Sequence, residues 1–248
     1  MNLSGRSVLV LRPRDQADAL AGLLRERGAE PVVVPAIEIQ APENSVDIDA
    51  AIRDATTFEW AVFTSVNGVR IVMDRVHELD VPFDPAHIGA IGPGTARALH
   101  GSGYGEVWTP PVYTTDALAE ELPDARGEVL LVRAEAAGNE LDRRLRDRGM
   151  RVRRIDAYRT VETNHDAIRA ALHGGVNAVL LTSASIAQSF ASAAGSATVP
   201  PVCCIGPATA AAARHAGLRV DAEAERHTVD GILHALESLP EQRHGRAS

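Results

Sequence analysis

The chain has 248 residues and a net charge of −8, and 45% of its residues are hydrophobic, a composition typical of a globular protein with one large or two ordinary domains. All 25 basic residues are arginine, which excludes chemistry that needs a lysine amine, such as Schiff-base formation, pyridoxal-phosphate catalysis or a Walker A phosphate loop. The acidic balance argues against nucleic acid as a partner, and the lack of a long apolar run or of an apolar leader at Met1–Arg6 predicts a cytoplasmic protein that does not engage a membrane.

The first half of the chain alternates short apolar strands with amphipathic helices. In chain order it holds a strand at 8–11 followed by Arg12, a helix at 17–27, an extended segment at 35–40, a strand at 60–63 followed by Thr64 and Ser65, and Ile91-Gly-Pro-Gly-Thr95. Small polar residues favour helix N-termini, so helices are expected to begin near Ser65, Thr95 and Asp116.

The second half repeats this order. It holds a strand at 128–132 followed by Arg133, a helix ending at Gly149, an extended segment at 155–161, a strand at 178–181 followed by Thr182 and Ser183, a helix from Ser185, and Cys204-Ile-Gly-Pro-Ala-Thr209. The offsets between equivalent residues are 133 − 12 = 121, 182 − 64 = 118 and 206 − 92 = 114, the slow drift of a duplicated unit with small insertions or deletions. The pattern predicts an α/β fold with two doubly wound parallel-sheet domains from an internal duplication, and the extended segments are candidate hinges.

Polar residues recur where the predicted strands end, which is where ligands of open α/β sheets bind. Each Thr-Ser pair alone fits a plain helix cap, but its recurrence in both halves favours two binding surfaces. The strand-end position also makes Arg12 and Arg133 candidate contacts for an acidic ligand. A dinucleotide site at Gly92-Pro-Gly-Thr95 is disfavoured, because Arg97 stands where a third glycine is needed and the proline removes an N–H.

The two cysteines, Cys203 and Cys204, are adjacent in an apolar segment. Neighbouring residues of a strand point to opposite faces, so we expect two buried thiols rather than a disulfide or a shared metal ion. The nine histidines show no HxxxH or HExxH spacing, and no metal is expected.

Several motifs together resemble those of the uroporphyrinogen-III synthase family: Thr64-Ser-Val-Asn-Gly68, the two Ile-Gly-Pro-x-Thr segments, Asp156-Ala-Tyr-Arg-Thr160 and His227-Thr-Val-Asp-Gly231. The resemblance implies one domain of residues 1–36 with 162–248, a second of 41–157, and a two-stranded extended connector of 37–40 and 158–161. It also implies an active-site cleft between the domains. The residues carried over as binding residues are Thr64, Ser65, Asn67, Gly92, Thr95, Thr182, Ser183, Gly206, Thr209 and Thr228.

The resemblance further implies that the chain closes the small-molecule substrate hydroxymethylbilane, a linear tetrapyrrole with eight carboxylates, into uroporphyrinogen III with no cofactor. We expect it to act as a monomer. Loss of water gives an electrophilic azafulvene, and a spiro intermediate then inverts the last pyrrole ring. Tyr158 is the candidate proton donor, because a phenol is a donor at neutral pH; packing at the hinge is its alternative role. A non-catalytic tetrapyrrole-sensing domain of the same fold and a two-lobed binding protein of periplasmic type are the rival functions.

Overall fold

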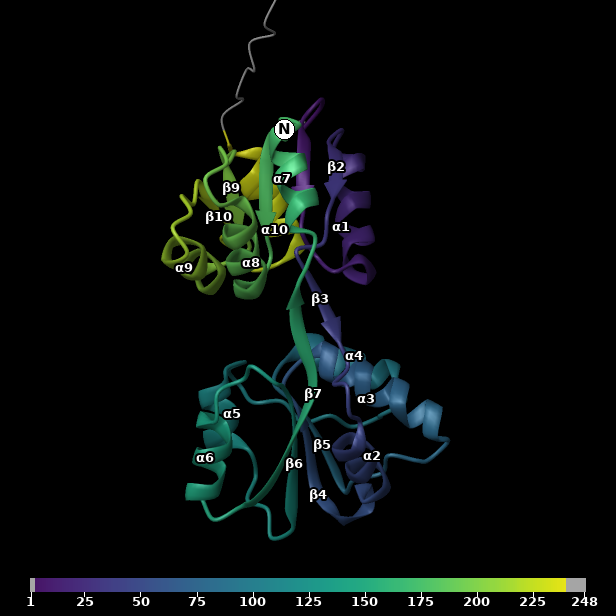
Figure 1. Cartoon of the computed structure of the whole chain (residues 1–248). Helices are drawn as coiled ribbons and strands as arrows, with labels where there is room; N and C mark the ends of the chain where they lie inside the picture. Colours follow the sequence, from purple (N-terminus) through teal and green to yellow (C-terminus); the bar gives the residue numbers. More distant parts are fainter. Residues whose placement is uncertain (1–2, 240–248) are drawn as a thin grey trace, which may run out of the picture. The chain divides into compact units, whose positions relative to one another are not determined.

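The computed structural model describes residues 3–239. The chain divides into two compact units, which are described separately: residues 1–38 with 161–248 form the first unit, and residues 39–160 form the second. Each unit is a five-stranded sheet with helices on both faces (Figure 1). The predicted α/β fold class is therefore confirmed.

The sheet of the first unit joins strands from both ends of the chain. Its order is β10-β9-β8-β1-β2, and every pair in it is parallel. The strands are β1 (Ser7–Val10), β2 (Glu30–Val33), β8 (Ala178–Leu181), β9 (Val202–Cys204) and β10 (Ala222–Glu223). Strand β1 lies beside β8 with Val8 opposite Ala178, so the central pair of this sheet comes from distant parts of the sequence.

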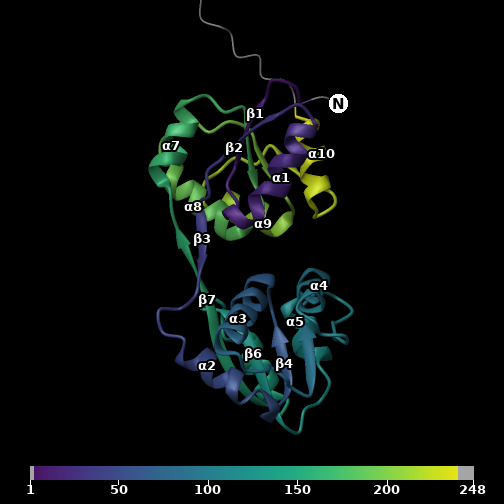
Figure 2. The ribbon, with the colours of Figure 1, turned by 90° about the vertical axis from the view of Figure 1, so that its right-hand side faces the viewer.

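Apolar residues on both faces of these strands require helices on both faces. Val8 and Val10 pack in one core with α1 (Arg14–Glu26) and α10 (Val229–Glu237). Helices α7 (His165–His173), α8 (Ala184–Ala194) and α9 (Pro207–His215) pack against one another, and Figure 2 shows α7 and α8 on the other side of the sheet from α1 and α10.

The sheet of the second unit has the order β3-β7-β6-β4-β5. Its strands are β3 (Ile37–Gln40), β4 (Phe58–Phe63), β5 (His87–Ala90), β6 (Glu128–Ala134) and β7 (Arg151–Glu162). Strands β4 to β7 are parallel, whereas the arrow of β3 runs opposite to that of β7 (Figure 1). The predicted hinge segment at 155–161 is thus the end of one continuous strand, while that at 35–40 includes the separate short strand β3.

Two hydrophobic cores lie on either side of this second sheet. One packs α2 (Val46–Arg53), α3 (Val66–Leu79) and α4 (Pro93–Gly101) against the sheet. The other packs α5 (Thr115–Glu121) and α6 (Glu140–Asp147), and a short 3₁₀ turn, Ala55–Thr57, precedes β4.

The same strand order in both sheets reflects the duplication. Strands β9-β8-β1-β2 of the first unit correspond to β5-β4-β6-β7 of the second. In the second unit the segment around Trp108 takes the place of β10, and it pairs with β5 through a single parallel bridge between Gly89 and Trp108. Equivalent residues therefore occupy equivalent places in the two units.

The predicted helix starts were correct to within a turn. Ser65 caps α3, as expected. The helix expected from Ser185 is instead capped by Ser183, the one expected near Asp116 is capped by Thr114, and Gly92 rather than Thr95 precedes α4.

Both cysteines are buried in β9 and free, which confirms the predicted buried thiols.

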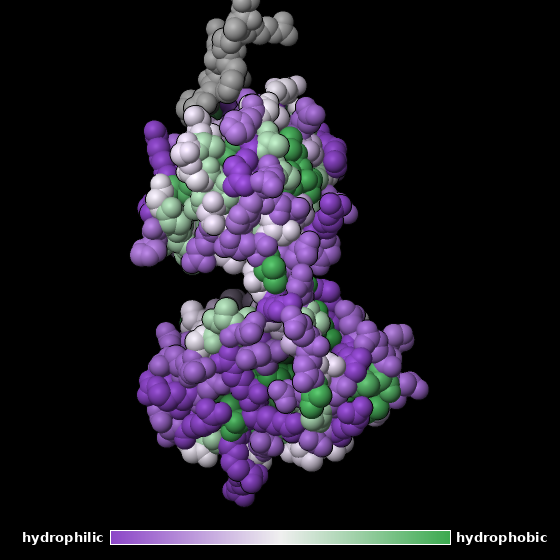
Figure 3. Space-filling model, viewed as in Figure 1, coloured by the Kyte–Doolittle hydropathy of each residue, from purple (hydrophilic) through white to green (hydrophobic). Residues whose placement is uncertain are grey.

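Hydrophilic residues cover most of the face drawn in Figure 3. Across residues 3–239, no helix combines the length and the apolar character needed to cross a membrane.

Candidate functional site

The polar residues singled out from the sequence lie at one edge of each sheet, because the carboxyl ends of parallel strands meet at the same edge. In the first unit this edge carries Arg12 after β1, Thr182 and Ser183 after β8, Gly206 after β9 and Thr228 after β10. In the second unit it carries Thr64 and Ser65 after β4, Gly92 after β5, Arg133 near the end of β6 and Tyr158 in β7.

Three of these residues are helix caps. The hydroxyl oxygens of Ser65, Ser183 and Thr228 accept hydrogen bonds from the backbone N–H three residues on, at 3.0, 3.2 and 3.1 Å. Each cap satisfies one N–H of the first turn and leaves others free to bind an anion. Thr114 caps α5 in the same way at 3.1 Å and was missed from the sequence. Its place 114 residues before Thr228, the offset between Gly92 and Gly206, could have revealed it.

Gly92 and Gly206 precede α4 and α9, and each lies against an aromatic ring. A Cβ on Gly92 would lie 3.1 Å from Cβ of Tyr113, and one on Gly206 would lie 2.8 Å from Cδ2 of His227. The backbone at both glycines is extended, a conformation open to any residue. A side chain at either position would therefore crowd the neighbouring Tyr113 or His227, whereas the backbone itself does not demand glycine.

The remaining predicted hydroxyl and amide residues differ in their access to a ligand. Thr95 and Thr209, in the first turns of α4 and α9, are buried. The Thr64 hydroxyl donates to the carbonyl of Val132 at 3.1 Å, which ties the end of β4 to β6. Thr182 and Asn67 are both half-buried.

Tyr158 lies near the start of α3. A Cβ on Gly68 would lie 3.4 Å from the Ser65 hydroxyl oxygen and 3.9 Å from the Tyr158 ring, so this glycine leaves room for both side chains. Tyr158 lines a cavity of about 250 Å³ together with Pro42, Glu43, Glu135, Asp156 and Arg159. Among the described residues, its hydroxyl has no hydrogen-bond partner and can serve as a donor to a ligand.

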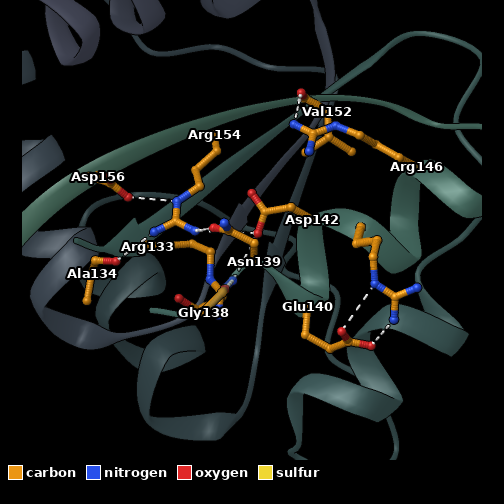
Figure 4. Close-up of polar contacts among 12 residues, drawn as sticks. Arg133, Ala134, Gly138, Asn139, Glu140, Asp142, Arg146, Val152, Arg154 and Asp156 are labelled. Carbon is orange, nitrogen blue, oxygen red and sulfur yellow. Dashed lines mark hydrogen bonds and ion pairs between the residues drawn. The ribbon is translucent and has the colours of Figure 1, made fainter. Parts of the chain in front are cut away.

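Arg133 is buried in an ion-pair network (Figure 4). Its Nη1 donates to the carbonyl of Gly138 at 2.6 Å and to the carboxylate of Asp142 at 3.0 Å. Arg154 bonds Asp156 and Asn139, both at 2.7 Å, and lies 3.7 Å from Asp142. A ligand carboxylate would therefore have to displace Asp142 to reach Arg133.

Arg12, the equivalent residue of the first unit, is half-buried in the loop between β1 and α1. Burial lowers the pKa of its guanidinium, and the Asp15 carboxylate opposes that shift. A partly desolvated cation gains from an added anion, so Arg12 suits a carboxylate ligand better than Arg133 does.

No group of three or more histidine, cysteine, aspartate or glutamate residues within 3–239 is arranged to hold a metal ion. The groups available for ligand binding at the carboxyl-end edges of the two sheets are hydroxyls, helix N-termini, arginine and exposed rings.

Comparison with known proteins identifies the family. The model of the family described as "Uroporphyrinogen-III synthase HemD" matches residues 18–234. The chain belongs to the uroporphyrinogen-III synthase family. Its members are enzymes of tetrapyrrole biosynthesis, as the sequence motifs predicted.

Individual relatives agree with this membership. The chain is 29% identical to the uroporphyrinogen-III synthase of Synechococcus elongatus over 97% of both chains. It is also 29% identical to the porphyrin biosynthesis protein HemD of Ruminiclostridium josui, of which it spans about half (48%). The fold is similar to that of a mutant uroporphyrinogen III synthase from Thermus thermophilus, with a TM-score of 0.66 and 21% identity over 94% of this chain and 98% of that one.

Proposed function

We propose that this chain cyclises hydroxymethylbilane to uroporphyrinogen III with inversion of the last pyrrole ring and loss of water. The observation that carries the proposal is the family match over residues 18–234, which spans both units. Hydroxyl donors and helix N-termini at the ligand-binding edge of each sheet support it, because they suit a substrate rich in carboxylates.

Tyr158 is the proposed proton donor. Its hydroxyl would protonate the terminal hydroxyl of the bilane, which then leaves as water and generates the azafulvene. The substituted carbon of the last pyrrole attacks this electrophile to form the spiro intermediate, whose cleavage and reclosure invert the ring. The pyrroles supply the electrons throughout, so the reaction as proposed needs no cofactor.

Backbone N–H groups at the starts of α3 and α8 are proposed to bind substrate carboxylates, together with Arg12 and the residues around Gly92 and Gly206. A helix N-terminus carries a partial positive charge, equivalent to about half an elementary charge. Local groups of this kind allow a chain with a net charge of −8 to bind a polyanion. We further propose that the enzyme acts as a monomer in the cytoplasm.

The test is product analysis after incubation of purified protein with hydroxymethylbilane in the presence of a chelator. Spontaneous closure gives the symmetric isomer I, so the expected result is diversion of the product to isomer III. A product of isomer I alone, equal to that of a protein-free control, would overturn the proposal and favour the sensing role.

A further inference from the structure

Tyr113 and His227 occupy equivalent places in the two units. Each stands 21 residues after the glycine that it contacts (113 − 92 and 227 − 206), and each directly precedes the threonine that caps the next helix. The two residues lie 114 apart, the offset of the glycines themselves. The same arrangement of ring, glycine and cap is thus built twice.

The backbone that carries each ring forms a tight turn. The N–H of Thr114 donates to the carbonyl of Val112 at 2.9 Å, and the N–H of Thr228 donates to that of Arg226 at 2.7 Å. Each bond closes a tight three-residue turn whose central residue is the aromatic one. The turn, the capped helix and the contact with glycine together limit the positions that each ring can take.

Neither ring contributes much to a core. Tyr113 is 59% exposed, and His227 is also exposed. Val112 and Val66 are 58% and 47% exposed, and Val66 opens α3 directly after Ser65. Five large hydrophobic residues are exposed in the described part of the chain. Three of them lie in the Tyr113 turn or at the start of α3, namely Val112, Tyr113 and Val66.

An exposed ring on a tight turn, at the sheet edge where ligands of open α/β sheets bind, is suited to contact a flat ligand. Aromatic rings favour stacked or edge-to-face contacts with other rings, and the adjoining N-termini of α4 and α9 favour carboxylates. This combination matches a pyrrole that carries acidic side chains.

We propose that Tyr113 and His227 are substrate-contacting residues, each of which binds a pyrrole ring of the substrate at the edge of its own unit. The inference rests on the proposed function and deepens it. In this arrangement Gly92 and Gly206 are required for the position of the ring, and Tyr113 and His227 contribute to substrate binding.

The test compares Tyr113→Ala and His227→Ala with the ring-retaining variants Tyr113→Phe and His227→Phe. Each alanine variant is expected to raise KM for hydroxymethylbilane about three- to tenfold, the range for one aromatic contact, at an unchanged melting temperature. The phenylalanine variants should stay within about twofold of the wild-type KM because the ring remains. His215→Ala, which removes an exposed histidine from the last turn of α9, is the matched control and should leave KM unchanged.

A wild-type KM in both alanine variants would overturn the inference, as would a loss of activity fully explained by a lower melting temperature. Calorimetric titration with uroporphyrinogen III under argon separates this inference from the proposed function. If the wild type binds the macrocycle but forms only isomer I, the proposed function fails, and weaker binding by the alanine variants would still support the ring contacts. Equal binding by all variants would reject them.

Discussion

Tyr158 combines a small exposed fraction, 9%, with a hydroxyl that has no partner among the described residues. Its ring is positioned by packing, since it belongs to the core that contains Val132 and Ile155. Removal of the hydroxyl alone should therefore preserve the fold while removing the proton donor.

We predict that Tyr158→Phe slows formation of isomer III about ten- to a hundredfold, at the low end for loss of a general acid, because water can replace part of its role. The isomer formed and the melting temperature should not change. Tyr104→Phe is the control: the Tyr104 hydroxyl donates to the carbonyl of Phe83 at 2.7 Å, so this variant should lose stability but not rate. Wild-type turnover by Tyr158→Phe would leave Tyr158 as a packing residue.

The ion pair between Arg133 and Asp142 is nearly excluded from water, with side chains 9% and 3% exposed. Asp142→Ala would leave a buried arginine without its carboxylate, so we predict a loss of about 3–5 kcal/mol in the free energy of unfolding. The double variant Arg133→Met/Asp142→Leu should recover most of that loss. Urea unfolding measures the stability of the single and the double variant. If the double variant is stable but has a much higher KM, Arg133 is a substrate contact after all.

Strand β9 places both thiols where ionisation is costly. Burial raises the pKa of Cys203 to about 12 and that of Cys204 to about 11, above the ordinary value of 9.0. The folded state therefore favours the neutral thiols. Their contribution is fully present below pH 9 and is lost as the pH rises through 9 towards 12, because the unfolded chain ionises first.

Urea unfolding at pH 8 and pH 10 should show this loss, at about 1 kcal/mol for each thiol at pH 10. Each Cys→Ala variant should show a smaller decline over the same interval. A stability that is equal at the two pH values in the wild type would contradict the assignment of two buried, neutral thiols.

Sequence patterns predicted secondary-structure elements better than they predicted tertiary contacts. The apolar runs of β1 and β8 were recognisable because strands buried on both faces carry no polar alternation. Three of the four expected helix caps were misplaced by two or three residues. Ser183 and Ser185, for example, are equally good caps in sequence, and only the backbone distinguishes them. Neither the burial of Arg133 nor the ring that lies over Gly92 could be predicted, because both depend on residues from other elements.

At the scale of the whole chain, the duplication is interleaved. Strands β1 and β2 share a sheet with β8 to β10, and β4 to β7 form the other parallel set. We propose that residues 1–36 with 162–248 and residues 41–157 are separate domains, connected by 37–40 and 158–161. The repeat offsets alone also fit two sequential halves, and they could not decide between these arrangements.

A fragment of residues 37–162 tests this division. It holds all five strands of the second sheet, helices α2 to α6 and both cores that cover the sheet, so we predict that it folds alone with a cooperative thermal transition. Residues 1–124, the first sequential half, are the control: they contain β4 and β5 without β6, and β1 without β8, so each sheet would expose the edge of a central strand. Circular dichroism melts of the two fragments give the comparison. A cooperative transition in 1–124 and none in 37–162 would reject the interleaved domains, because each core would then have to form from residues that this arrangement separates.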